Sequence, residues 1–197
     1  MKKEGYNALR LPYLLLLSLS IFALATSCEE DYQPKPEGYY RIGLPGTTYD
    51  TLKTDCPYSV LVNNDAKFIT KKDCWADIRY PKIRGTIQLT YKDVQGKAEL
   101  DEILKESQDL AYKHTVAAQG IGEKLYLNPD KKVFGILYQM QGNAASSAQF
   151  FVTDSTRHFL RGVLYFYSAP NADSLQPVNN YMYGEMVHLI ENLEWKN

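Results

Sequence analysis

The sequence predicts an α+β fold in which an antiparallel sheet is flanked by helices. Two patterns indicate this: apolar residues that alternate with polar ones, typical of strands with one covered face, and apolar residues spaced three or four apart, typical of amphipathic helices. Along the 197 residues the order is strands, helix, four strands, helix. Short turns between the later strands favour antiparallel pairing, so helices on one or both faces of the sheet complete a layered domain.

The first strands are predicted at 58–62, 75–80 and 83–91. The segment 83–91 gives the clearest signal, because apolar or small side chains alternate with polar ones along its whole length. Residues 41–57 contain two prolines and are expected to form a loop.

A helix is predicted at 97–119, and Gly120 stands where glycine commonly ends a helix. Its apolar stripe consists of Leu100, Ile103, Leu104, Leu110, Ala111, His114, Ala117 and Ala118. One face of this helix is therefore expected to pack on the sheet.

Four more strands follow the helix, at 123–127, 133–141, 148–153 and 158–167. Turn-forming residues link them: Asn128-Pro129-Asp130, Gln141-Gly142-Asn143 and Asp154-Ser155-Thr156. A second helix is predicted at 177–193, with Asp173 and Ser174 capping its approach, and Trp195 is expected to close on the core. No repeat or second domain is indicated, so 41–197 is predicted to be a single domain.

The first 27 residues are predicted to be a lipoprotein signal peptide. Lys2, Lys3 and Arg10 precede the apolar stretch Leu11–Ala25, which is shorter than the about 20 residues of a spanning helix, and small residues lead to Cys28. The mature chain is expected to begin at Cys28, with a diacylglycerol on its thiol and two or three fatty chains, such as palmitate, in all. An uncleaved anchor, or an ordinary secretory signal with a chance cysteine, is the alternative.

Residues 28–40 are predicted to be the lipidated N-terminus and a flexible tether, because they are charged and contain Pro34 and Pro36. Removing residues 1–27 takes away three basic residues and one acidic residue, a net +2, and changes the formal charge from −1 to −3. This mild acidity argues against nucleic acid as a partner.

Two cysteines, Cys56 and Cys74, remain after lipidation of Cys28. An even number in an oxidising compartment favours a disulfide, which would contribute about 3 kcal/mol by constraining the unfolded chain. Two free thiols or a redox pair are the alternatives.

The sequence gives no positive support for an enzyme. Gly-x-Ser-x-Gly, His-Glu-x-x-His, phosphate-loop and calcium-loop patterns do not occur in it. We therefore predict no catalytic residue, no metal ligand and no cofactor. The carboxylates Asp173 and Glu185 are interpreted as a helix-entry group and a surface group.

Each of the three histidines also has a structural explanation. His114 lies on the apolar stripe of the first helix, and His188 near Glu191 is too small a set for a metal site. His158 follows Asp154 and Ser155, but a turn chosen for its hydrogen bonding explains that spacing better than a catalytic triad.

Sixteen tyrosines are many for a chain of this length. Tyrosine is an ordinary sheet residue, which is the favoured explanation. Tyrosines lining a groove for sugars or peptides are the alternative.

A series of short segments resembles the gliding-motility lipoprotein GldD family of the Bacteroidota. In the second half they are Gly135–Tyr138, Ala148–Thr156, His158–Phe166 and Asn171–Leu175 with Pro177. Upstream they are Pro34–Pro36 with Gly38–Tyr39, Cys56–Tyr58, Tyr80–Pro81, Leu89–Lys92 and Tyr112–His114. The last third is also similar to the Mog1/PsbP type of α/β/α sandwich.

This resemblance implies a non-catalytic lipoprotein needed for gliding and for the associated type IX secretion machinery. Its expected partners are a membrane, through the lipid anchor, and other gliding or secretion proteins of the cell envelope. The outer membrane is favoured over the inner one. Glu29-Glu30-Asp31 resembles a surface-export signal, and the choice between the periplasmic and the surface face stays open.

Two other functions remain as alternatives. One is an envelope lipoprotein that binds a sugar or peptide in a tyrosine-rich groove. The other is a hydrolase that uses His158 or His114.

Overall fold

The computed structural model describes residues 43–52, 54–113, 118–142, 144–167 and 172–196, without the side chains of 118, 119 and 172–174. The signal peptide, Cys28, the tether and His114 lie outside the described residues. Every strand and helix below belongs to the unit Tyr40–Asn197.

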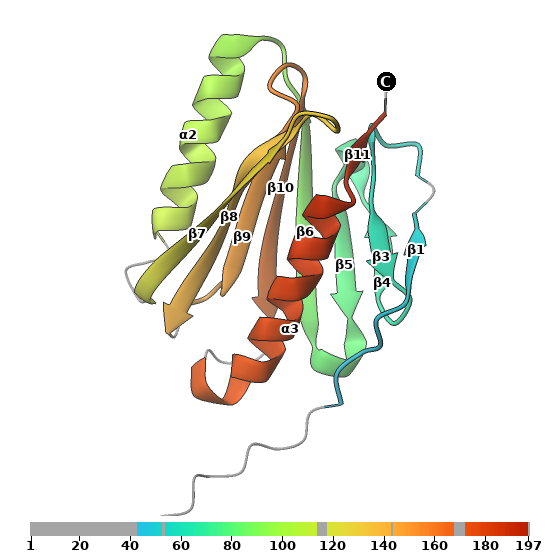
Figure 1. Ribbon diagram of the computed structural model, residues 1–197, viewed down its shortest axis with the longest axis vertical. Coiled ribbons are helices and arrows are strands. Elements are labelled where there is room, and N and C mark those ends of the chain that lie inside the picture. Colours follow the sequence, from blue (N-terminus) through green and yellow to red (C-terminus); the bar gives the residue numbers. More distant parts are fainter. Residues whose placement is uncertain (1–42, 53, 114–117, 143, 168–171, 197) are drawn as a thin grey trace, which may run out of the picture. The chain divides into compact units, whose positions relative to one another are not determined.

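Seven antiparallel strands form the central sheet, in the order β4-β5-β6-β10-β9-β8-β7 (Figure 1). Their bounds are β4 Lys67–Thr70, β5 Ala76–Tyr80, β6 Gly85–Asp93, β7 Ala118–Asn128, β8 Val133–Gly142, β9 Ala148–Thr153 and β10 His158–Phe166. In this sheet, β4–β6 join β7–β10 through the pairing of β6 with β10, which spans nine residues of each strand.

One helix packs on each face of this sheet: α2, Lys97–Lys113, and α3, Ala172–Glu191. Alternate residues of β8 show the two faces, because Leu137 belongs to the core cluster of α3 and Tyr138 to the core cluster of α2. Each helix contributes a buried stripe to its cluster, Met182, Met186 and Ile190 from α3 and Leu100 and Ile103 from α2. The α+β prediction, an antiparallel sheet flanked by helices, is confirmed.

Short strands extend the layer on the α3 face. β1 (Tyr49–Thr51) pairs with β3 (Leu61–Asn63), and β2 (Tyr58–Ser59) pairs with the last strand, β11 (Glu194–Trp195). The predicted loop 41–57 therefore contains a strand, and the predicted strand 58–62 is two strands. These two strands, β2 and β3, are separate because β2 pairs with β11 and β3 pairs with β1.

The first helix is shorter than predicted. It ends at Lys113, and Ala118 already belongs to β7, so the predicted end at 119 is wrong. Gly120 does not end the helix, because it pairs with Gln141 of β8. Pairing with β8 places 118–122 in a strand, and this tertiary contact outweighs the high helix propensity of the alanine at 118.

The second helix begins earlier than predicted, at Ala172, so Asp173 and Ser174 lie within it instead of capping its approach. Pro177 is inside the helix and does not begin it. As the sixth residue of the helix, Pro177 removes one backbone hydrogen bond, because only the first four N–H groups of a helix lack helical partners.

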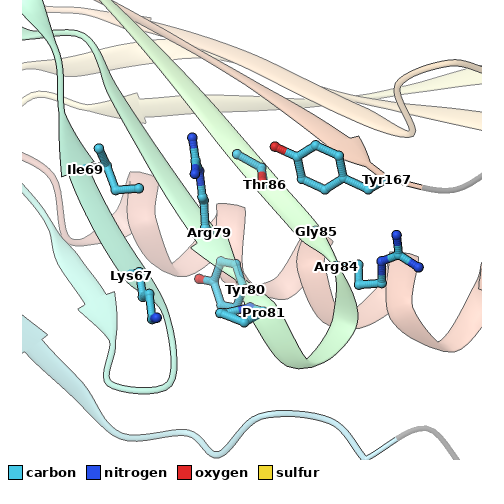
Figure 2. Close-up of a pocket in the computed structure, with 9 residues that line it drawn as sticks. All are labelled: Lys67, Ile69, Arg79, Tyr80, Pro81, Arg84, Gly85, Thr86 and Tyr167. Carbon is cyan, nitrogen blue, oxygen red and sulfur yellow. The ribbon is translucent and has the colours of Figure 1, made fainter.

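Helix α2 covers only part of its face of the sheet. The strand residues in its cluster are Tyr138, Met140, Phe151 and Phe159, from β8, β9 and β10. The same face of β4, β5 and β6 carries polar side chains, among them Lys67, Asp77, Arg79 and Gln88. Figure 2 looks onto this part of the sheet, with α3 behind it.

Candidate functional site

A groove of about 530 Å³ lies over β4, β5 and β6, on the face opposite α3 (Figure 2). We call it the basic groove; it is lined by Lys67, Ile69, Arg79, Tyr80, Pro81, Arg84, Gly85, Thr86 and Tyr167. Strand register builds it, because Lys67 lies opposite Arg79 and Arg79 opposite Thr86. Tyr167, just past β10, joins it through the hydrogen bond from its N–H to the carbonyl of Arg84 (3.1 Å).

The positive charges of the basic groove are only partly neutralised. Asp77 has a side chain that is 3% exposed, and it accepts hydrogen bonds from Lys71 (2.5 Å) and Arg79 (3.0 Å). Burial opposes its charged form, but these two cations lower the pKa of Asp77 overall. Within the described part of the chain, Lys67 and Arg84 form no ion pair.

Apolar and polar groups meet on the floor of the basic groove. Tyr167 and Ile69 are 59% and 37% exposed, whereas Thr86 is 1% exposed. The buried hydroxyl of Thr86 has no hydrogen-bond partner among the described residues, and Figure 2 places this residue between Arg79 and Tyr167. The arrangement suits an anion that also has an apolar part, because arginine forks bind carboxylate or phosphate and the tyrosine ring offers contact area.

Glu185 is buried and not the surface group that the sequence analysis expected. Its carboxylate accepts hydrogen bonds from the hydroxyls of Tyr49 and Tyr80, each at 2.8 Å. These partners come from β1 and β5, so the carboxylate connects α3 to two strands that lie more than 100 positions away in sequence. A buried carboxylate is tolerated because its oxygens are hydrogen-bonded.

The tyrosines around Glu185 are held in the neutral form. Burial, and then the hydrogen bond to Glu185, raise the pKa of Tyr49 to about 12. Burial and the charge of Glu185 also raise the pKa values of Tyr80 and Tyr181 above the usual range. Tyr181 extends the cluster, because it accepts a hydrogen bond from the Asn63 amide at 3.0 Å. The cluster works as a brace between elements.

The residues Asp154, Ser155 and His158 form a turn and not a triad. One oxygen of Asp154 accepts hydrogen bonds from the backbone N–H groups of Thr156, Arg157 and His158, at 2.8–2.9 Å. The His158 ring turns elsewhere, with Nδ1 2.7 Å from the Tyr91 hydroxyl and its face stacked on Trp195 at 5.2 Å.

His188 and Glu191 do not share a site. The His188 ring packs against Tyr49 with centroids 3.8 Å apart, and Glu191 faces Lys124 at 3.5 Å. Across the described ranges, no group of three or more His, Cys, Asp or Glu side chains could hold a metal ion.

Cys56 and Cys74 form a disulfide with Cα atoms 5.5 Å apart, as the sequence analysis favoured. It ties the segment before β2 to the 3₁₀ turn Lys72–Cys74, ahead of β5. Tyr58 strengthens the junction by donating its hydroxyl to the Cys74 carbonyl at 2.8 Å.

The described tyrosines do not gather around one groove. Five of them are buried in the two core clusters: Tyr58, Tyr80, Tyr91, Tyr126 and Tyr138. The basic groove is lined by two, Tyr80 and Tyr167, together with three cations. Tyrosine thus serves mainly as a sheet residue here, the favoured explanation from the sequence. None of the helices in the described ranges has the length and apolar character needed to cross a membrane.

The fold, together with the predicted lipoprotein signal, is what we expect of one class of protein: an α+β envelope domain attached by a lipid. Within this class, the chain belongs to the gliding motility lipoprotein GldD family, whose sequence model matches residues 29–195. The match begins at the residue after Cys28 and covers nearly all of the predicted mature chain. Membership implies a lipid-anchored location in the cell envelope. A search of the curated proteins found no match to the chain.

Proposed function

We propose that this lipoprotein is a non-catalytic assembly component of the type IX secretion machinery on which gliding depends. The observation that carries the proposal is the family match over residues 29–195. The proposal places the lipid on Cys28 and the protein in the outer membrane, where it acts by contact with other envelope proteins.

The arrangement of the potential catalytic groups supports a contact role. Asp154 closes a turn, Glu185 braces a helix, and His158 lies between Tyr91 and Trp195. Each of these groups already has a structural role.

A deletion strain complemented with variants tests the proposal. We expect deletion to abolish spreading on agar and secretion of type IX cargo, and the wild-type gene to restore both. Cys28→Ser is expected to fail, because the protein is released from the membrane. His158→Gln keeps a hydrogen-bonding side chain beside Tyr91 and is expected to restore both activities.

Immunoblots of the membrane fraction control for protein level in each strain. Normal spreading and cargo secretion in the deletion strain would contradict the proposed role. Loss of secretion in a fully expressed, membrane-bound His158→Gln strain would contradict its non-catalytic part.

A further inference from the structure

The basic groove holds more positive charge than its surroundings balance. Lys67, Arg79 and Arg84 line it, and Asp77 beneath them is already shared between Lys71 and Arg79. The Thr86 hydroxyl on its floor is a buried hydrogen-bonding group to which the described part of the chain gives no partner, and this costs free energy unless a ligand supplies one. Both features call for an anion with acceptor oxygens.

The basic groove lies at the end of the domain where the described chain begins. The N–H of Gly46 donates to Asp65 (2.9 Å), and the same carboxylate pairs with Lys82 (2.9 Å) in the turn before Arg84. Gly43, the first described residue, follows Cys28 by 15 positions. This length of chain spans at most about 50 Å when extended, so a lipid on Cys28 keeps the domain close to a bilayer.

We propose that the basic groove binds the phosphate of an anionic lipid headgroup in the membrane that holds the anchor. This inference rests on the proposed attachment of lipid at Cys28. Arg79 and Arg84 supply guanidinium donors, Lys67 a point charge and Thr86 a hydroxyl. Ile69 and Tyr167 provide exposed apolar surface beside these cations, and this combination of side chains is typical of the headgroup region.

The anchor makes a weak headgroup contact effective. Once one end of the chain is in the bilayer, the second contact is intramolecular, and its effective concentration is set by the tether. The contact would orient the domain on the membrane by its β5–β6 end. Because the groove is open to solvent, salt would screen the interaction.

Hydrogen exchange on the lipidated full chain tests this proposal. The protein is reconstituted in vesicles of phosphatidylcholine alone and in equimolar mixtures with phosphatidylglycerol. We expect amides of β4 and of the 80–86 hairpin to exchange about fivefold more slowly with the anionic lipid, as for a site four-fifths occupied. High salt should remove the difference. Equal exchange in both kinds of vesicle would overturn the proposal.

Matched charge variants locate the effect. Lys67→Gln combined with Arg84→Asn removes two groove cations, and asparagine tolerates the left-handed backbone of position 84 (φ 53°). Lys92→Gln combined with Lys105→Gln removes two exposed cations that do not line the groove. The first pair should abolish the slowing and the second should keep it. The same loss in both pairs would indicate net charge alone and overturn the assignment to the groove.

Inorganic phosphate distinguishes the source of the anion. Added to phosphatidylcholine vesicles at matched ionic strength, it should leave the exchange unchanged; equal slowing by free phosphate would overturn the headgroup assignment. The mass of the N-terminal peptide reports lipid attachment separately. A lipidated protein without slowing refutes the groove alone, whereas an unmodified Cys28 refutes the anchoring on which the proposed function rests.

Discussion

Asp154 accepts most of the hydrogen bonds that its side-chain and backbone neighbours donate in the turn between β9 and β10. Besides three backbone N–H groups, it accepts a hydrogen bond from the Thr156 hydroxyl at 2.6 Å. Burial opposes its charged form, but these donors together lower its pKa from 3.8 to about 2. A carboxylate with a lowered pKa in the folded state stabilises the fold above the unfolded pKa, and this contribution is lost as the pH falls from about 4 through 2.

Asp154→Asn is therefore expected to destabilise the protein at pH 7 by about 1–2 kcal/mol, after allowance for solvent screening. The difference from wild type should shrink as the pH falls toward 2. Urea unfolding at a series of pH values measures both effects. Asp130→Asn, in the exposed turn between β7 and β8, is the control and should change little. A constant difference at all pH values would contradict this account of the turn.

Glu185 shows what a single buried carboxylate does for the position of a helix. It is 6% exposed and accepts hydrogen bonds from two tyrosine hydroxyls, one of them on β1 and the other on β5. Glu185→Ala is expected to cost about 3 kcal/mol, because it leaves two hydroxyls without their acceptor. Glu185→Gln should cost less, since its amide oxygen still accepts one hydrogen bond. Thermal unfolding of both variants measures their stabilities. Equal loss of stability in the two would show that the hydrogen bonds from Tyr49 and Tyr80 do not stabilise the fold.

At the scale of elements, two glycines show how strands and helices differ in the space they leave. A Cβ atom on Gly135 of β8 would lie 2.0 Å from the Phe151 carbonyl oxygen, whereas one on Gly184 of α3 meets nothing within 4 Å. Gly135→Ala is expected to destabilise the protein by about 3 kcal/mol or more, because backbone must move. Gly184→Ala should stabilise it by up to about 1 kcal/mol through helix propensity. Unfolding in guanidinium measures the free energy of unfolding of both variants. A lower value for Gly184→Ala than for wild type would show that the added methyl group does not fit at this position.

The disulfide secures the small strands before β5. Its two cysteines are 18 positions apart, and their bridge constrains the unfolded chain. Cys56→Ser combined with Cys74→Ser is expected to lower the free energy of unfolding by about 3 kcal/mol. Reduced wild-type protein should unfold at the same denaturant concentration as the variant. Two thiols that react with iodoacetamide in the native, unreduced protein would contradict the bridge.

The sequence predicts elements well where their signal is local. Alternation in 83–91 located β6, because a strand with one covered face repeats every two residues, and the turn around Asp154 followed from its own side chains. Residues 118 and 119 were assigned to the helix and 120–122 to no strand, since only β8, reached later in the chain, makes this segment a strand. Tyr49 and β1 lay in a segment with loop composition.

The site residues are harder to predict for the same reason. The partners of Glu185 are 105 and 136 positions away, so a position that resembled an exposed helical acid is buried. The basic groove gathers Lys67, Arg79 and Arg84 through the register of three strands, one of which was not predicted. The polar side of β6 was visible in sequence as a solvent face, but Thr86 on that side is covered.

At the scale of the whole domain, the two ends of the sheet differ in character. β4 ends one side with Lys67, whereas β7 ends the other with Leu125 and Leu127, which are 61% and 68% exposed. An exposed apolar edge strand favours association with another sheet edge. Leu125→Lys combined with Leu127→Lys should reduce self-association while changing stability by less than about 1 kcal/mol.

Sedimentation velocity over a range of protein concentrations measures this effect. Leu44→Lys changes another exposed leucine, away from the sheet edge, and should leave association as in wild type. Equal behaviour of the edge variant and wild type would show that β7 is not the associating edge.

The pairing of β11 with β2 brings the last described residues against the first third of the chain. The N–H of Lys196 bonds the Pro57 carbonyl (2.9 Å), and its ammonium bonds that of Thr54 (2.6 Å). Because β2 pairs with Glu194–Trp195, its hydrogen bonds in this small sheet form only when these late residues are present. A chain that ends before Glu194 therefore cannot complete the pairing that holds β2.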